Sequence, residues 1–180
     1  MRLNEMIKSL QQWDREGVYL FSKADLGKIF NEQGRRLTSS LSRATEAGLL
    51  ERVARGLYLN ANSSHIGGYT VEDIASRLRR GEFCYVSLES AASQWGVISQ
   101  IPVGRLTVMT TGREGEFRTR FGAIEFVHTD ANFEELEAST IDWPGRPLRF
   151  ASKQRTVRDL LACRRSLDLI DWEEVNEDAD

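Results

Sequence analysis

Histidine and cysteine are scarce in this 180-residue chain, which has two of each. Cys84 and Cys163 belong to no CxxC pair, and His65 and His128 lie far apart, so no familiar metal-ligand spacing is present. We therefore expect structural thiols, no disulfide, no metal site and no cofactor. Reduced cysteines also fit a cytoplasmic protein better than a secreted one.

Long apolar runs and glycine-rich phosphate-binding motifs are also missing. No run approaches the roughly 18 apolar residues that a membrane span needs, and charges interrupt the N-terminal segment too often for a signal peptide. Neither GxGxxG nor GxxxxGK[ST] occurs. His128 beside Asp130 could be a base with its orienting carboxylate, but a hydrogen-bonded structural role is the more common use. The sequence predicts a protein that is not an enzyme and has no membrane partner.

The composition favours a folded, charge-asymmetric protein. Apolar residues make up 41% of the chain, which is enough for a buried core, and charged residues make up 28%. This composition is not that of a wholly disordered protein. The net charge is −3, but seven of the 27 acidic residues lie in residues 166–180, which contain no Lys or Arg. The remaining 20 acids and 24 bases give residues 1–165 a charge of +4. A mildly basic head with an acidic tail permits nucleic-acid binding without requiring it.

The first 60 residues predict three short helices followed by a hairpin. Apolar residues at three- and four-residue spacing mark a helix near residues 3–13, a second after the capping-box pair Ser22 and Asp25, and a third at 37–47. Two β-prone runs then meet at Gly56, which suits a tight turn. This order is typical of a winged helix-turn-helix in residues 1–60.

The third predicted helix has the divided surface that a DNA-reading helix needs. Leu37, Leu41 and Ala44 share one face, and small hydroxyl side chains lie opposite. Arg43 suits a bidentate contact to guanine, whereas the arginines at the helix entrance and the hairpin turn suit the DNA backbone. The candidate DNA-binding residues are Arg35, Arg36, Thr38, Ser39, Ser42, Arg43, Arg52 and Arg55. The alternative is an ordinary helical domain with a solvated polar face, or a protein-binding module.

The rest of the chain predicts a linker, a second domain and a tail. Residues 61–68 are small, polar and glycine-rich, as in a linker. Residues 69–165 alternate helix and strand patterns, which favours a smaller α+β domain with a mainly antiparallel sheet. The helix near residues 153–165 is basic and could contact DNA or balance the acidic tail at 166–180. The tail could form a docking helix, but we expect a frayed terminal helix.

Four segments resemble the AbiEi family of type IV toxin–antitoxin antitoxins. They are the run FSKADLGKIF to ARGLYL in residues 21–59, YVSLESAASQWGVI in 85–98, TVMTTGREGEFRTRFGAIEFVHT in 107–129 and ASKQRTVRDLLACR in 151–164. Together they span most of the chain in a consistent order.

The resemblance implies a phage-defence repressor that autoregulates its operon by binding double-stranded DNA at inverted repeats in its own promoter. It also implies a nucleotidyltransferase-type toxin as a functional partner, countered without a stable complex. Members of the family often extend further beyond the segment matching residues 151–164, so repression is better supported than toxin neutralisation. We expect a monomer in solution that binds DNA cooperatively. The alternative functions are a protein-interaction module and a stand-alone winged-helix regulator without antitoxin activity.

Overall fold

The computed structural model describes residues 2–177 and divides into two compact units, one ending at Thr70 and the other beginning at Val71. The last acids of the predicted tail, Asp178 and Asp180, lie outside the described residues. Within residues 2–177, no helix is long and apolar enough to cross a membrane. The second unit is the larger of the two, contrary to the expectation of a smaller second domain.

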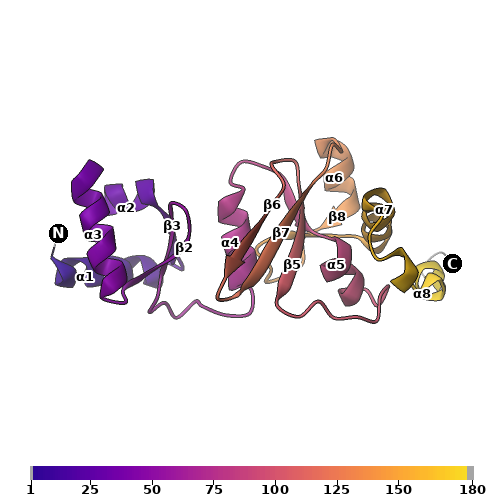
Figure 1. Ribbon diagram of the computed structural model, residues 1–180, viewed down its shortest axis with the longest axis horizontal. Helices are drawn as coiled ribbons and strands as arrows, with labels where there is room; N and C mark the ends of the chain where they lie inside the picture. Colours follow the sequence, from indigo (N-terminus) through magenta and orange to yellow (C-terminus); the bar gives the residue numbers. More distant parts are fainter. Residues whose placement is uncertain (1, 178–180) are drawn as a thin grey trace. The chain divides into compact units, whose positions relative to one another are not determined.

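The first unit combines three helices with a three-stranded antiparallel sheet of order β1-β3-β2 (Figure 1). Its elements are α1 (Leu3–Arg15), β1 (Leu20–Ser22), α2 (Lys23–Ile29), α3 (Gly34–Glu46), β2 (Leu50–Ala54) and β3 (Leu57–Asn60). The predicted capping box starts α2, because Ser22 Oγ accepts the Asp25 amide at 3.1 Å and the Asp25 carboxylate accepts the Ser22 amide at 2.9 Å.

The core of the first unit is built from the apolar spacing that the sequence displays. The buried side chains are Met6, Leu10, Phe21, Leu26, Phe30, Leu37, Leu41, Ala44 and Leu50. All three helices contribute to this cluster, so the position of α3 is fixed by its inward face.

Part of the segment expected to be a linker is held against α1. The Asp14 carboxylate accepts hydrogen bonds from the Ser63 hydroxyl and, at 3.1 Å, from the Ser64 hydroxyl. His65 Nε2 lies 2.8 Å from the Asp14 carbonyl oxygen, and the His65 ring stacks on Tyr19. These bonds, the one from Ser63 above all, lower the pKa of Asp14. The first unit therefore includes residues beyond its last strand.

The second unit is α+β, as expected, with a six-stranded sheet of order β6-β7-β5-β4-β9-β8. Its strands are β4 (Cys84–Val86), β5 (Arg105–Thr110), β6 (Gly115–Thr119), β7 (Gly122–His128), β8 (Thr140–Ile141) and β9 (Arg149–Ala151). Its helices are α4 (Thr70–Leu78), α5 (Leu88–Gln94), α6 (Phe133–Ser139), α7 (Lys153–Cys163), the 3-10 turn η1 (Leu167–Leu169) and α8 (Trp172–Asn176).

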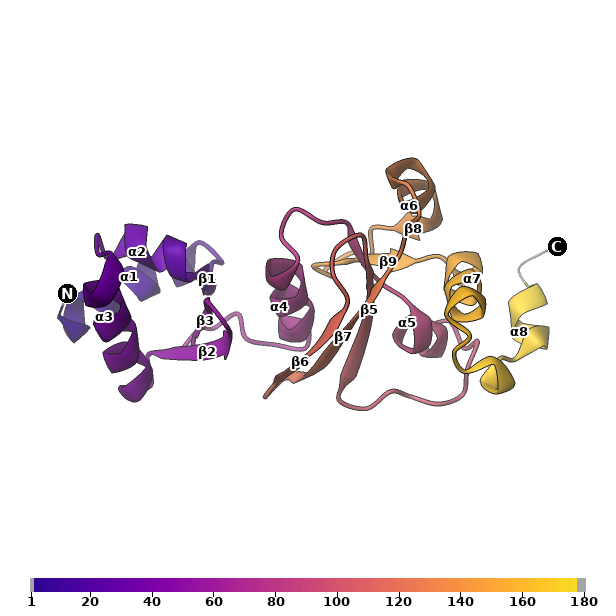
Figure 2. The ribbon, with the colours of Figure 1, turned by 45° about the horizontal axis from the view of Figure 1, so that its top comes forward.

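The sheet is mixed. Three neighbouring pairs are antiparallel, but β5 with β7 and β4 with β9 run parallel, which the sequence analysis did not anticipate. Helix α4 lies on one side of the sheet, and α5, α7 and α8 lie on the other (Figures 1 and 2). The central strand β5 is accordingly buried along nearly its whole length.

The basic helix α7 buries part of its charge inside the second unit. Arg155 is buried and lies 2.9 Å from the Asp159 carboxylate and 2.7 Å from Glu135. Asp159 also accepts hydrogen bonds from Tyr85 at 3.0 Å and from Ser87 at 2.7 Å. Burial raises the pKa of Asp159 against the opposing effect of these partners. This charge network is part of the core, so it is not available to DNA.

The acidic tail is docked within the described residues. Ile170 is buried, the Asp171 amide donates to the Val97 carbonyl at 2.8 Å, and Lys153 Nζ lies 2.8 Å from Glu174. One base of α7 therefore balances the tail, which was one of the two alternatives for this helix. Helix α8 is docked, so the expectation of a frayed terminal helix is wrong for the described residues.

Candidate nucleic-acid interface

Helix α3 presents the predicted polar face to solvent because its opposite face is packed. Leu37, Leu41 and Ala44 are buried as expected, and Ser40 is buried beside them. All eight residues proposed to contact DNA are exposed: Arg35, Arg36, Thr38, Ser39, Ser42, Arg43, Arg52 and Arg55. Six of them lie on α3 and two on the β2–β3 hairpin.

Helices α2 and α3 approach each other closely at Gly27. A Cβ atom at this position would lie 3.1 Å from the Glu32 carbonyl oxygen and 3.2 Å from Leu37 Cδ2. The missing side chain therefore allows the turn between the helices to fold against α2. Asn31 adopts a left-handed conformation, with φ of 49°, within that turn.

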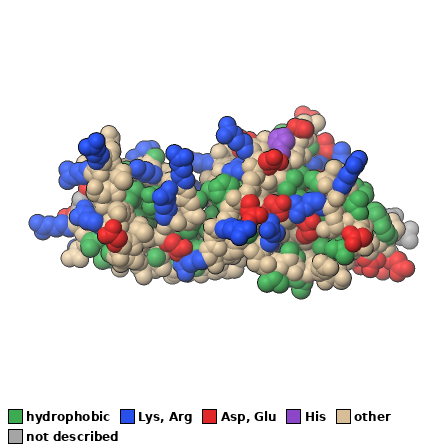
Figure 3. Space-filling view, viewed as in Figure 1, with side chains coloured by type: hydrophobic (Ala, Val, Ile, Leu, Met, Phe, Trp, Pro, Cys, Tyr) green, Lys and Arg blue, Asp and Glu red, His purple; other side chains and the backbone are tan. Residues whose placement is uncertain are grey.

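Arg35 and Arg36 lie in the first turn of α3, which begins earlier than the predicted Leu37. Arg36 Nε forms an ion pair with Glu32 at 3.3 Å while the Arg36 side chain stays 79% exposed. Blue side chains gather over α3 and over the β2–β3 hairpin in Figure 3. The helix entrance thus carries two exposed cations, in positions suited to phosphate contacts.

Two of the three proposed hydroxyl groups already have intramolecular partners. Thr38 Oγ1 donates to the Gly34 carbonyl at 3.1 Å and accepts from Lys23 Nζ at 3.0 Å. Ser42 Oγ donates to Glu46 at 2.9 Å. Base or phosphate contacts by these hydroxyls would replace exposed bonds, which are worth little in water.

Arg43 lies on the exposed face of α3 with its guanidinium turned toward its own helix. Its Nη2 donates to Ser40 Oγ at 3.0 Å. A contact to a base would require the side chain to give up this bond and extend.

The hairpin places its two arginines at separate points. Arg52 is paired opposite Tyr58, next to a register irregularity between Arg52 and Ala54. Arg55 occupies the turn before Gly56, whose φ of 77° suits glycine there. Arg55 is thus the cation at the tip, and Arg52 lies further back on the strand.

Lys23 and Lys28 were not among the sequence candidates. Both are exposed and line an open groove of about 780 Å³ between α2 and α3. Lys23 directly follows the N-cap Ser22, so the sequence indicates that Lys23 lies at the start of a helix. The sequence does not indicate its contact with Thr38, because that contact depends on how α2 packs on α3.

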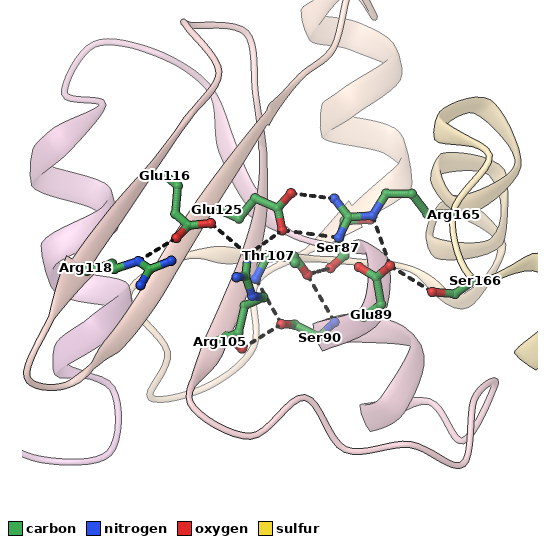
Figure 4. Close-up of polar contacts among 10 residues, drawn as sticks. All are labelled: Ser87, Glu89, Ser90, Arg105, Thr107, Glu116, Arg118, Glu125, Arg165 and Ser166. Carbon is green, nitrogen blue, oxygen red and sulfur yellow. Dashed lines mark hydrogen bonds and ion pairs between the residues drawn. The ribbon is translucent and has the colours of Figure 1, made fainter.

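The second unit has an extended set of polar contacts across one part of its sheet (Figure 4). Arg105 pairs with Glu116 at 3.2 Å and with Glu125 at 3.0 Å, and Arg165 pairs with Glu125 at 2.7 Å and with Glu89 at 3.0 Å. Hydrogen bonds from Arg165 hold the pKa of Glu125 below its usual range. Because acids and bases alternate, this face offers no concentrated positive charge to DNA.

Among the described residues, those weighed for catalysis or metal binding form no cluster beyond the pair of His128 and Asp130. His128 is bonded to the Gly112 carbonyl at 2.8 Å and to Asp130 at 2.9 Å, and burial raises the pKa of both Cys84 and Cys163. Over residues 2–177 no group of three or more His, Cys, Asp or Glu side chains could hold a metal ion.

No protein-family model matches the sequence, and no curated protein matches it significantly. The structure is similar to a crystal structure of the RV2827C protein from Mycobacterium tuberculosis, with a TM-score of 0.61 and 14% sequence identity. The match covers 89% of this chain and 61% of that protein, so this chain spans about three fifths of its length. At this identity the likeness concerns the fold alone.

Proposed function

We propose that the first unit is a winged helix-turn-helix that binds duplex DNA, with α3 as the recognition helix and the β2–β3 hairpin as the wing. One observation carries the proposal: α3 is anchored by a buried apolar face, and its outer face carries exposed hydroxyl and arginine side chains, with Glu46 in the last turn. A helix in the major groove needs this division of its surface.

The proposed contacts fall into two classes. Arg35, Arg36, Arg55 and Lys23 are cations suited to phosphates, which supply affinity and salt dependence. Arg43 lies beside the small side chains of Ser39 and Ser42, so it can approach a base edge. The exposed hydroxyl groups of these serines can approach a base in the same way.

On this basis the protein is a transcriptional repressor of the AbiEi type, acting at inverted repeats in its own promoter. The resemblance of its four sequence segments supports this part of the proposal, and the first of these segments, residues 21–59, forms α2, α3 and the β2–β3 hairpin of the first unit. An antitoxin role toward a nucleotidyltransferase-type toxin is the second part and rests on the resemblance alone. A protein-interaction module is the alternative, favoured by the intramolecular partners of Thr38 and Ser42.

The test is fluorescence anisotropy of the full chain with a duplex from its own upstream region and with a scrambled duplex. We expect tighter binding to the upstream duplex and a steep loss of affinity with salt. The Arg35→Ala/Arg36→Ala variant should lose affinity, while Arg118→Ala, which removes an exposed arginine of the second unit, should not. Equal, weak binding to both duplexes would support the interaction module instead.

A further inference from the structure

A cavity in the second unit is separate from every site described above. It has a volume of about 600 Å³ and opens at the amino-terminal ends of the parallel strands β4 and β9, beside the last turn of α4. Its lining includes Arg77, Arg80, Phe83, Cys84, Leu148 and Arg149. All of these residues belong to the second unit.

Arginines surround the cavity, but they differ in what holds them. Arg149 is fixed by Thr140 at 2.8 Å and by Asp142 at 3.1 Å. Arg79 donates to the Arg113 carbonyl at 2.9 Å and lies over the Phe126 ring. Arg77 and Arg80 are exposed, and neither forms a hydrogen bond or ion pair with another described residue.

Two unpaired guanidinium groups on one concave surface are a site for an anion. Each offers a planar set of donors that matches the oxygens of a phosphate group. Basic residues near the C-terminal end of α4 also interact favourably with the helix dipole. That interaction does not require two of them to line one cavity. The cavity is lined by more arginines than acidic residues, the acids being Asp73 and Glu82. Glu82 already accepts a hydrogen bond from the Thr111 hydroxyl at 3.0 Å.

The rest of the cavity indicates what else the ligand carries. Phe83, Leu148 and Pro147 provide an apolar wall beside the arginines. A volume of about 600 Å³ lies within the usual range for small-molecule sites and exceeds what a single phosphate ion fills. The surface is concave, whereas the phosphates of duplex DNA lie on a convex cylinder, so a small ligand fits better than DNA.

We propose that this cavity binds a phosphate-bearing small molecule of nucleotide size, with Arg77 and Arg80 on the phosphates and Phe83 and Leu148 against the apolar part. The proposal does not depend on DNA binding by the first unit.

The test is isothermal titration calorimetry of the full chain, without DNA, using ATP, GTP, pyrophosphate and inorganic phosphate in turn. We expect ATP or GTP to bind more tightly than pyrophosphate, and inorganic phosphate to bind weakest. Arg77→Ala and Arg80→Ala should each lower nucleotide affinity about tenfold or more, since each removes a charge-assisted contact. Arg118→Ala is the matched control: it removes one exposed arginine of the same unit, on β6, and should change the affinity less than about twofold.

A second readout follows Cys84, which lines the cavity, while Cys163 does not. Saturating nucleotide should slow alkylation of Cys84 by iodoacetamide, measured by mass spectrometry, and leave Cys163 unchanged. Four outcomes would overturn the proposal: no binding of any probe at millimolar concentration, binding that survives Arg77→Ala/Arg80→Ala, an equal loss in Arg118→Ala, or no protection of Cys84. If Arg80→Ala weakened duplex DNA binding while nucleotides failed to bind, this surface would be a second DNA contact and not a nucleotide site.

Discussion

Arginines that look alike in the sequence have different surroundings in the structure. Arg155 is buried in an ion-pair network, Arg43 is bonded to Ser40, and Arg55 is exposed at a turn. The free energy of a contact to DNA depends on which bonds the side chain must give up and on whether it reaches a base or a phosphate.

Arg43→Ala is expected to reduce the discrimination between operator and scrambled DNA by about 1–3 kcal/mol, the usual contribution of one good bidentate base contact. Arg55→Ala should weaken both duplexes alike, because a phosphate contact carries no sequence information. Anisotropy titrations on matched duplexes measure both effects. If Arg43→Ala weakened both duplexes equally, Arg43 would be a phosphate contact.

His128 provides a pH-dependent test of the second unit. The hydrogen bond to Asp130 and, second, the bond to the Gly112 carbonyl raise the pKa of His128 above the ordinary value for histidine. The charged imidazolium is therefore favoured in the folded state, and its contribution to stability is complete below the unfolded pKa and lost as pH rises through the folded pKa. An NMR titration of the ring protons should show the raised pKa, and Asp130→Asn should lower it. The same pKa in both proteins would mean that Asp130 does not hold the ring in solution.

The helices of the first unit depend on contacts that individual residues allow. A side chain at position 27 of α2 would have too little room, because Glu32 and Leu37 lie close to Gly27. Its role is therefore steric, although glycine by itself weakens a helix.

Gly27→Val is expected to lower the free energy of unfolding by about 1–3 kcal/mol, because the added methyl groups must displace backbone atoms of the turn. It should also weaken DNA binding by shifting α3. Urea denaturation and anisotropy measure the two effects. The control is Ala24→Val, an exposed position of the same helix, where only the β-branched helix penalty of less than about 0.7 kcal/mol applies. If Gly27→Val lost no more stability than Ala24→Val, crowding at Gly27 would not be the reason for glycine at this position.

At the scale of the whole molecule, the boundary of the first unit lies beyond residue 60. Asp14 binds Ser63 and Ser64, and Tyr19 donates to Thr70 Oγ1 at 3.4 Å. A fragment of residues 1–70 keeps these bonds, and one of residues 1–60 does not.

Residues 1–70 alone are expected to fold and to bind DNA weakly, since a single unit makes few phosphate contacts. The 1–60 fragment should unfold at a lower urea concentration, because it lacks the partners of Asp14. Circular dichroism and low-salt anisotropy test this. A folded 1–70 fragment without any DNA affinity would count against the proposed function.

The full chain is expected to be a monomer in solution and to bind paired half-sites cooperatively. Two copies held on one duplex have a high effective concentration, so a modest contact between second units is enough. Titrations on one and two half-sites should show cooperativity for the full chain and none for residues 1–70. If the fragment were equally cooperative, the second unit would not be the coupling element, and toxin control would be the remaining role to test.

The sequence by itself determined the elements whose signals are local. Apolar spacing identified α3 and its buried face, the Ser22 and Asp25 pair identified the start of α2, and two β-prone runs meeting at Gly56 identified the β2–β3 hairpin. Helix α6 and strand β8 were missed, because a seven-residue helix and a two-residue strand are too short to display a period.

Only the tertiary structure decided which strands are neighbours and which charges are paired. The parallel pairing of β4 with β9 joins residues more than 60 positions apart, and no local pattern specifies such a register. Arg155 is buried and paired, whereas Arg77 and Arg80 are exposed beside a cavity. The difference arises because packing brings Glu135 of α6 to Arg155, which also pairs with Asp159 four residues on in α7, whereas no acid among the described residues pairs with Arg77 or Arg80.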